Sequence, residues 1–261
     1  MKNRYASVRE VDEMTVALHS VVAVPRPVTP ATDFWEVLHS FSNQSLWRYF
    51  HCDGDGRWIH QGLLCGSLVI VHDGSYMVEV DKSVCSAGFM IYCKNTQHKA
   101  KGTVVEKSDQ ADNYRGEILG GLMIQLVLKA AAQTSHSCYE PVQVDCDNIG
   151  VVRHGNSASK KLKAKQSQAD VLRSLKQLIT SQVFDTIYEW VASHQDDKKK
   201  WKDLTLRERM NVIVDKLAKL ALITGIVDQE FINSDFPFEQ LRLRVGGKKI
   251  TGSIKTAVSN H

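Results

Sequence analysis

Between about residues 66 and 225, apolar residues occur first in short continuous runs and later at a helical spacing. Continuous runs rich in Val and Ile and bounded by polar or turn residues are typical of strands buried in a sheet. Such runs predict strands at Leu68–Val71, Val84–Lys94, His98–Lys107, Val142–Cys146 and Phe184–Val191. After the first run we expect a turn at Asp73-Gly74-Ser75, and after the fourth we expect Asp147 to lead into a short helix.

Apolar residues spaced three and four positions apart predict helices. The ranges with this spacing are Asn113–Ala132, Gln166–Thr180 and Arg207–Thr224, and a shorter helix is expected at Asn148–His154. Gly225 should end the last of them, because glycine commonly follows the final helical residue. The resulting order is three strands, helix, strand, helices, strand, helix. This order predicts the α/β class, with a mixed sheet flanked by helices.

The two flanks differ from this central part, and we divide the chain at residues 65 and 225. Residues 1–65 form an N-terminal extension with three of the five prolines and three of the five tryptophans. It is expected to be rich in loops, apart from a short helix capped by Thr32 or Asp33. We expect its tryptophans to pack on the central domain, residues 66–225. Residues 226–261 form a basic C-terminal extension, in which residues 241–251 predict a β-hairpin.

Composition bounds the partners of the chain. A hydrophobic fraction of 43% and a charged fraction of 24% are ordinary for a globular protein, and a net charge of +4 says little by itself. The basic residues are clustered, however, in three runs that contain no acid: Lys160 to Lys165, Lys198 to Lys202, and the tail from Leu241. Clustered cations favour a polyanionic partner.

The cysteines and the hydropathy pattern indicate a compartment. The six cysteines form no CxxC pair and no zinc-ligand spacing, which is typical of a reduced, intracellular protein. No segment has the length and apolar character of a signal peptide or a membrane span. We therefore expect a cytoplasmic or nuclear protein without a membrane partner.

Four acidic residues carry the candidate chemistry. Asp73 and Asp147 follow predicted strands, whereas Glu117 and Asp215 lie on predicted helices, and His194 precedes the last of the four. This alternation can bring carboxylates together at one edge of a sheet. Carboxylates that converge there are suited to holding divalent metal ions for phosphodiester chemistry.

Asp145 is an alternative to Asp147. The two residues are two positions apart, so they share a face if the strand continues. On these grounds either could be the ligand.

With these residues in their local settings, the sequence between about residues 66 and 224 resembles the ribonuclease H family. The resemblance is greatest to the ribonuclease H domain of eukaryotic retrotransposon reverse-transcriptase polyproteins. It lies in Asp73-Gly74-Ser75, Tyr114-Arg115-Gly116-Glu117, Asp147, Ser193-His194-Gln195 and Asp215-Lys216-Leu217-Ala218. The resemblance implies a mixed five-stranded sheet flanked by helices, with the two extensions outside it, and membership of a larger polyprotein.

The resemblance also implies an activity, the hydrolysis of the RNA strand of RNA–DNA hybrids. Asp73, Glu117, Asp147 and Asp215 would hold two Mg²⁺ ions, for which Mn²⁺ could substitute, and His194 would assist proton transfer and product release. Asp147 is favoured over Asp145, because the family's ligand is the last strand residue before the helix. Contacts to the hybrid are expected from Ser75, Asn113, Arg115, Asn148, Lys160, Lys161 and Lys163. The first four could sense the 2′-hydroxyl, which distinguishes RNA from DNA.

Two other functions stay open. One is a catalytically silent nucleic-acid-binding or scaffold module of the same fold, although no acid of the quartet is missing. The other is a related nuclease such as an integrase or transposase. Those domains usually have three acids, of which the last is a Glu on a helix, whereas this chain has Asp215 preceded by His194. The sequence leaves the oligomeric state undetermined.

Overall fold

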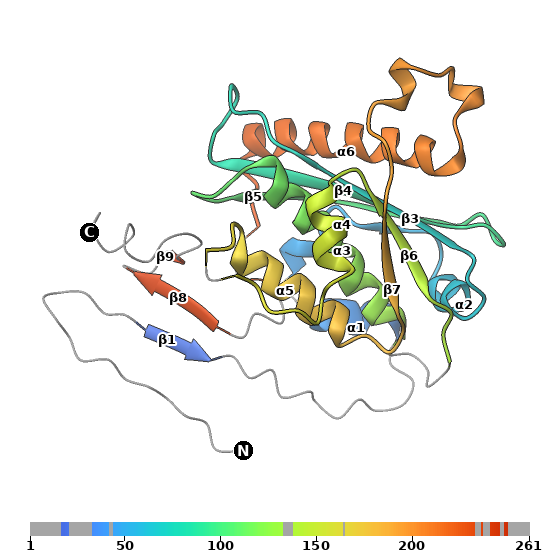
Figure 1. Cartoon of the computed structure of the whole chain (residues 1–261), viewed down its shortest axis with the longest axis horizontal. Helices are drawn as coiled ribbons and strands as arrows, with labels where there is room; N and C mark the ends of the chain where they lie inside the picture. The colour runs from blue at the N-terminus through green and yellow to red at the C-terminus, as the bar shows by residue number, and fades with distance from the viewer. Residues whose placement is uncertain are drawn as a thin grey trace, which may run out of the picture.

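A computed structural model describes residues 17–20, 33–41, 44–132, 138–163, 165–232, 236, 241–245 and 248–249. Its main sheet has six strands in the order β2-β5-β4-β3-β6-β7 (Figure 1). They are β2 His51–Cys52, β3 Leu68–Ser75, β4 Val84–Cys93, β5 Lys99–Lys107, β6 Val142–Cys146 and β7 Thr186–Trp190. The pairs β2–β5, β5–β4 and β4–β3 are antiparallel, whereas the pairs β3–β6 and β6–β7 are parallel. The expected mixed α/β sheet is confirmed, and the sixth strand is the short β2 from the N-terminal region.

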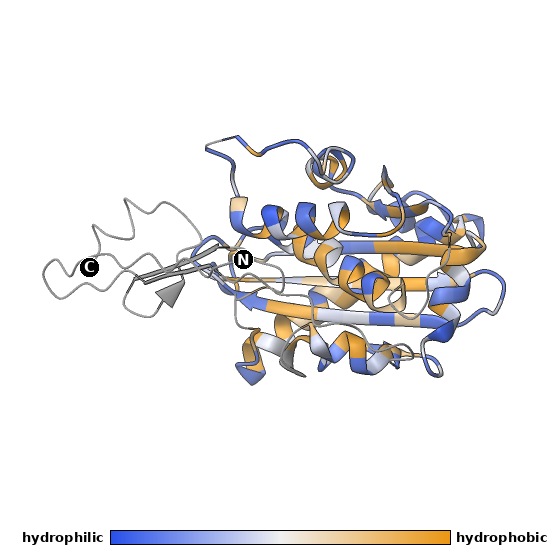
Figure 2. Cartoon of the chain, turned by 90° about the horizontal axis from the view of Figure 1, so that it is seen from below, coloured by the Kyte–Doolittle hydropathy of each residue, from blue (hydrophilic) through white to orange (hydrophobic). Residues whose placement is uncertain are grey.

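Helices cover both faces of this sheet (Figures 1 and 2). One face carries α3, against which α1, α2, α4 and α5 lie, and the other face carries α6. The helices are α1 Phe34–Ser40, α2 Arg57–Leu64, α3 Asn113–Ala132, α4 Ile149–Gly155, α5 Ala169–Thr180 and α6 Leu206–Asp228. Alternate side chains of β3 point to opposite faces of the sheet. Ile70 belongs to the core beneath α3, whereas Val69 and Val71 pack against α6.

A second, smaller sheet joins the two flanks. It contains β1 Ala17–Ser20, β8 Leu241–Val245 and β9 Lys248–Lys249 in that order. Strands β8 and β9 pair antiparallel where a hairpin was expected, and Gly246 and Gly247 between them lie outside the described residues. Its pairing with β1 was not predicted, because a four-residue strand has no periodicity of its own.

The N-terminal tryptophans pack on the core, as expected. Trp47 and Trp58 are buried, and Trp35 packs against the same cluster from a partly exposed position. Asp33 caps α1 by accepting a hydrogen bond from the backbone N–H of Trp35. The expectation of loops was wrong for α2, whose apolar residues face α3.

Three expected boundaries were also wrong. Helix α5 begins at Ala169 and not at Gln166. Strand β3 runs through the predicted turn to Ser75, because Asp73, Gly74 and Ser75 pair with β4. Helix α6 continues past Gly225 to Asp228. A side chain at Gly225 would meet the methyl groups of Val105 at 2.9 Å, so this glycine allows a close approach of helix and sheet. Among the described residues, no helix combines the length and apolar character that a membrane span requires.

Glycines also set how closely α3 approaches β3. A Cβ atom on Gly74 would lie 2.4 Å from the backbone nitrogen of Glu117, and one on Gly116 would lie 2.5 Å from the carbonyl oxygen of Ser86. These neighbours are backbone atoms and cannot rotate away. The absence of side chains at both positions therefore places the first turn of α3 directly against the end of β3.

Gly74→Ala should consequently destabilise the protein by about 1–3 kcal/mol, as overpacked positions do. Chemical unfolding of the full chain would measure this loss. Gly121→Ala is a matched control within α3, because its Cβ would meet no atom closer than 3.3 Å and should cost less. Equal stability of Gly74→Ala and the unsubstituted chain would contradict the close approach.

Candidate metal centre

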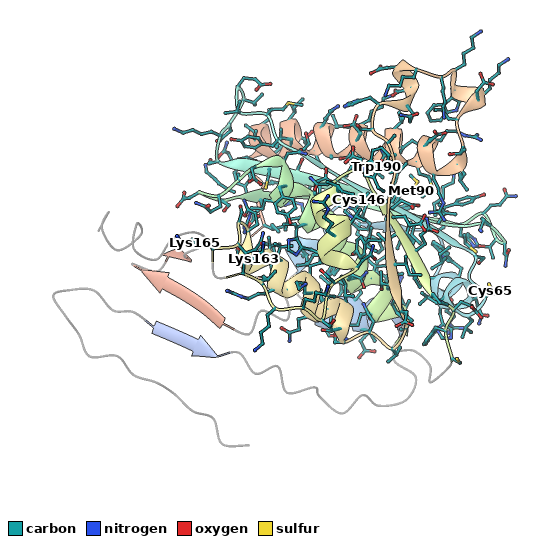
Figure 3. All side chains as sticks on the ribbon, in the orientation of Figure 1. Cys65, Met90, Cys146, Lys163, Lys165 and Trp190 are labelled. Carbon is teal, nitrogen blue, oxygen red and sulfur yellow. The ribbon has the colours of Figure 1, made fainter. Side chains whose placement is uncertain are left out.

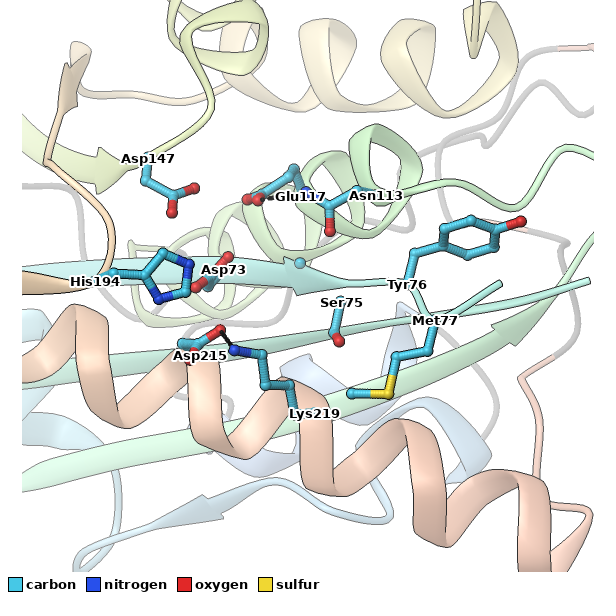
Figure 4. Close-up of a pocket in the computed structure, with 11 residues that line it drawn as sticks. Asp73, Ser75, Tyr76, Met77, Asn113, Glu117, Asp147, His194, Asp215 and Lys219 are labelled. Carbon is cyan, nitrogen blue, oxygen red and sulfur yellow. Dashed lines mark hydrogen bonds and ion pairs between the residues drawn. The ribbon is translucent and has the colours of Figure 1, made fainter. Parts of the chain in front are cut away.

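The four acidic residues come from four elements that meet at one end of the sheet. Asp73 lies near the end of β3, and Glu117 lies in the first turns of α3, held close by the contact at Gly74. Asp147 follows β6 directly, and Asp215 lies on α6. Asp73 lies on the same face of β3 as Val69 and Val71, the face that carries α6. Its carboxylate lies between Glu117 and Asp215 (Figure 4).

The first three acids are close enough to share a metal ion. Asp73, Glu117 and Asp147 each offer a carboxylate oxygen, and these atoms all lie within 4.8 Å of one another. With Asp215 and His194 they line an open pocket of about 190 Å³ (Figure 4). Their oxygens are hard ligands of the kind that Mg²⁺ and Mn²⁺ prefer. The donor set therefore fits divalent metal.

The carboxylates are strongly perturbed because they are buried together. Burial, followed by the negative charge of Asp147, raises the pKa of Asp73 to about 7. Burial and then the charge of Asp73 raise the pKa of Glu117 well above its usual value, and burial also raises the pKa of Asp147. Carboxyl groups that repel one another in this way are stabilised as anions by a bound cation.

Asp145 is placed away from this pocket. It lies on β6, is buried, and forms an ion pair with Arg207 of α6. Its other oxygen accepts a hydrogen bond from Gln143 at 2.7 Å. Asp147 lies beyond the end of β6, where the chain turns into α4, and Trp190 holds this turn by donating its indole N–H to the Asp147 carbonyl at 2.9 Å. The choice of Asp147 over Asp145 thus agrees with the geometry of the pocket.

Asp215 and His194 close the side of the pocket that faces α6. Lys219, one helical turn after Asp215, lies 2.8 Å from its carboxylate. His194 is exposed and has a left-handed backbone conformation, with φ 50° and ψ 43°. A non-glycine residue in this conformation is uncommon, and it turns the imidazole toward the acids (Figure 4).

Of the seven residues expected to contact substrate, two line the pocket. Ser75 lies on β3 two residues after Asp73, and Asn113 begins α3 and donates to Glu117 at 3.5 Å. Asn148 instead caps α4, accepting from the backbone N–H groups of Gly150 and Val151. Lys160, Lys161 and Lys163 are exposed in the segment between α4 and α5, and Figure 3 shows Lys163 well apart from Cys146, the neighbour of Asp147.

The expectation that Arg115 contacts the substrate was wrong. Its side chain is fully buried, and all five guanidinium N–H donors are used inside the protein. Two donate to Glu106, two to Asp170 and one to Gln168, at 2.6–3.0 Å. No donor remains for a substrate. The neighbouring helical position of Glu117 made Arg115 appear part of the site, but helical geometry turns the two side chains in different directions.

Three residues of this region were not predicted from the sequence. Lys219 could have been found from its spacing of four residues after Asp215 on one helix. Trp190 is an aromatic residue at a strand end, which is too common to be a signal. The burial of His72 beside Glu117 depends on the register of β3 with β6 and has no sequence signal at all.

No family model and no curated protein matches this chain. It is similar to solved structures of RNase H domains. The N-terminal RNase H domain of rv2228c from Mycobacterium tuberculosis is 18% identical, with a TM-score of 0.44 over 62% of this chain and 97% of that one. LC11-RNase H1 in complex with an RNA/DNA hybrid is 12% identical, with a TM-score of 0.45 over 61% and 99%. The RNase H domain of PFV is 16% identical, with a TM-score of 0.45 over 60% and 95%.

Proposed function

We propose that this chain is a metal-dependent endonuclease that hydrolyses the RNA strand of RNA–DNA hybrids. The observation that carries the proposal is the convergence of Asp73, Glu117 and Asp147 within 4.8 Å, with Asp215 and His194 on the same pocket. Crowded carboxylates without matching cations have a structural cost. Binding of divalent cations would offset this cost, and a metal-dependent activity therefore explains why the carboxylates lie together.

Two ions would be held in this pocket, both Mg²⁺ or, as a substitute, Mn²⁺. Asp73, Glu117 and Asp147 would hold one, and Asp73 with Asp215 would hold the other. Bound metal supplies a nucleophilic water and stabilises charge on the leaving oxygen. His194, exposed at the pocket rim, would carry a proton to or from the departing strand.

The substrate is proposed from the groups at the rim. Ser75 and Asn113 offer a hydroxyl and an amide beside the carboxylates, and these groups can recognise the 2′-hydroxyl of the strand that is cut. The exposed lysines Lys160, Lys161 and Lys163 would contact phosphates farther along the hybrid. Asn148 is proposed to sense the 2′-hydroxyl only through its amide nitrogen, because its side-chain oxygen caps α4.

A retroelement origin is part of the proposal, as is the division into an extension at 1–65, a catalytic domain at 66–225 and a basic extension at 226–261. Its support is the set of motifs around the four acids. A reverse-transcriptase polyprotein would then be the larger assembly in which the domain acts.

The test uses a hybrid labelled on either strand, with Mg²⁺, with Mn²⁺ and with chelator, beside DNA and RNA duplexes of the same sequence. Asp147→Asn and Asp145→Asn form a matched pair of identical changes two residues apart. We expect Asp147→Asn to lower cleavage at least about 100-fold, or about 2.7 kcal/mol of transition-state stabilisation. Asp145→Asn should retain most activity, because Asp145 faces Arg207 and not the pocket.

Cleavage of the RNA strand that needs metal and is lost only in Asp147→Asn would support the proposal. Equal loss in both variants, with both still folded by circular dichroism, would contradict the assignment of the site. Cutting of the DNA strand or of duplex DNA would point to another class of nuclease.

A second candidate is a module that binds nucleic acid without cutting it. The observation in its favour is the ion pair between Lys219 and Asp215, since the ammonium group occupies a carboxylate that a metal ion would need. Hybrid binding without cleavage under either metal, restored to cleavage by Lys219→Ala, would identify a pocket blocked by its own lysine.

A further inference from the structure

A second group of ligand-type side chains lies behind the acidic pocket, on the α3 face of the sheet. His72 of β3 and Cys146 of β6 are register partners on neighbouring parallel strands, so their side chains project on the same side. Glu117 of α3 reaches them from above. One ligand atom from each of the three residues lies within 4.8 Å of the other two, and each residue is at most 1% exposed.

The imidazole of His72 is the unusual member of this group. Both of its ring nitrogens are buried, and neither has a hydrogen-bond partner among the residues that the structure describes. Buried polar atoms are nearly always paired, because an unpaired one has lost its hydrogen bonds to water without replacement. Gly120 of α3 lies close against the ring, where a Cβ atom would come within 2.9 Å of its Nδ1 atom.

Two of the three separations between the ligand atoms are close to those around a tetrahedral ion. His72 Nδ1 lies 3.9 Å from Glu117 Oε2, and Cys146 Sγ lies 3.6 Å from the same oxygen. A zinc ion with ligands at about 2.0–2.3 Å holds them about 3.3–3.8 Å apart. Only small side-chain shifts are needed to reach that geometry.

We propose that His72, Cys146 and Glu117 form a zinc site, with water in the fourth position. Thiolate and imidazole favour Zn²⁺ over Mg²⁺, which prefers oxygen ligands and keeps its water. On binding, the Cys146 thiol, which otherwise donates toward Glu117, releases its proton to solvent and becomes the thiolate ligand. No oxidation or reduction is involved.

The position of Glu117 connects this site to the pocket. Glu117 lines the acidic pocket and also contacts both members of the inner group. A zinc ion on the inner side would hold its Oε2 atom and turn the carboxylate away from the metal ions of the pocket. Zinc should therefore inhibit cleavage. This inhibition rests on the proposed nuclease function, whereas the binding of zinc is independent of it.

Cobalt(II) is the probe that tests the binding, because a thiolate ligand gives it a charge-transfer absorption. We expect the full-length protein to bind one equivalent with this absorption, and Zn²⁺ to abolish it by displacement. Cys146→Ala and Cys146→Ser should lose the absorption. Cys85→Ala is the matched control, since Cys85 is equally buried on β4 but belongs to no such group among the described residues.

Absence of the absorption in the unsubstituted protein, or its persistence in both Cys146 variants, would overturn the zinc site. In the cleavage assay with excess Mg²⁺, Cys146→Ala should need at least about tenfold more Zn²⁺ for half inhibition, about 1.4 kcal/mol in binding. Equal zinc sensitivity of Cys146→Ala and Cys85→Ala would overturn the inhibitory role. A protein that cuts nothing but shows the cobalt absorption would retain the zinc site and refute the nuclease.

Discussion

Asp73→Asn should abolish metal-dependent cleavage and at the same time make the metal-free protein more stable at neutral pH. The activity should fall at least about 1,000-fold, or about 4 kcal/mol in transition-state stabilisation. Asp73 lies between Glu117 and Asp215 and is the carboxylate that both metal ions would share (Figure 4). An amide has the same shape but carries no charge for a metal ion to balance.

The gain in stability follows from the pKa of Asp73, which burial and the charge of Asp147 raise from 3.8 to about 7. A carboxyl group with a raised pKa in the folded state contributes stability below its unfolded pKa, and this contribution is lost as pH rises through the folded pKa. The free energy of unfolding of the metal-free protein should thus fall by about 2–3 kcal/mol between pH 5 and pH 8 because Asp73 ionises. Asp73→Asn removes that loss.

Chemical unfolding at pH 5 and pH 8, with chelator and with Mg²⁺, measures the pH-dependent loss of stability and its removal in Asp73→Asn. The cleavage assay measures the loss of activity. Mg²⁺ should stabilise the unsubstituted protein at pH 8 and have little effect on Asp73→Asn. Asp197→Asn, an exposed residue near His194, is the control and should leave the pH dependence unchanged. If Asp73→Asn has the same pH dependence as the unsubstituted chain, the crowding of the carboxylates is not the source of the instability.

Arg115→Met should have the largest effect on stability, a loss of about 3–5 kcal/mol. The guanidinium group is fully buried and forms paired hydrogen bonds with Glu106 and Asp170, and it lies 5.8 Å from the centre of the Phe236 ring. Removing it leaves the carboxylate of Glu106 buried without its counter-ion. An uncompensated buried charge costs more than the ion pair contributes.

A double-mutant cycle with Glu106→Gln separates the cost of an unpaired buried charge from the contribution of the ion pair itself. The double variant should be less destabilised than the sum of the single variants, because neither charge is then left alone. Unfolding by denaturant gives the four free energies. Additive losses would contradict a direct coupling, and a loss below about 1 kcal/mol for Arg115→Met would show that water reaches the site.

The long helices and central strands were predictable because each carries its own apolar pattern. Helix α3 and strand β6 have the predicted bounds, since both are buried along nearly their whole length. Predictions from a single local signal were less reliable. The turn at Asp73-Gly74-Ser75 and the helix end at Gly225 rested on residue types alone, and both were overridden by contacts with neighbouring elements.

The sequence by itself determined which acids could form a site, because their order on strand, helix, strand and helix restricts them to one edge of a sheet. It did not determine which neighbours take part. Arg115 and Asp145 lie within two residues of site acids, yet the tertiary structure pairs both with partners elsewhere in the protein. The register of β3 with β6 and the close approach of α3 place His72 and Cys146 beside Glu117. Only the three-dimensional packing decides such pairings, since each depends on which face of a strand or helix a side chain occupies and on what lies opposite.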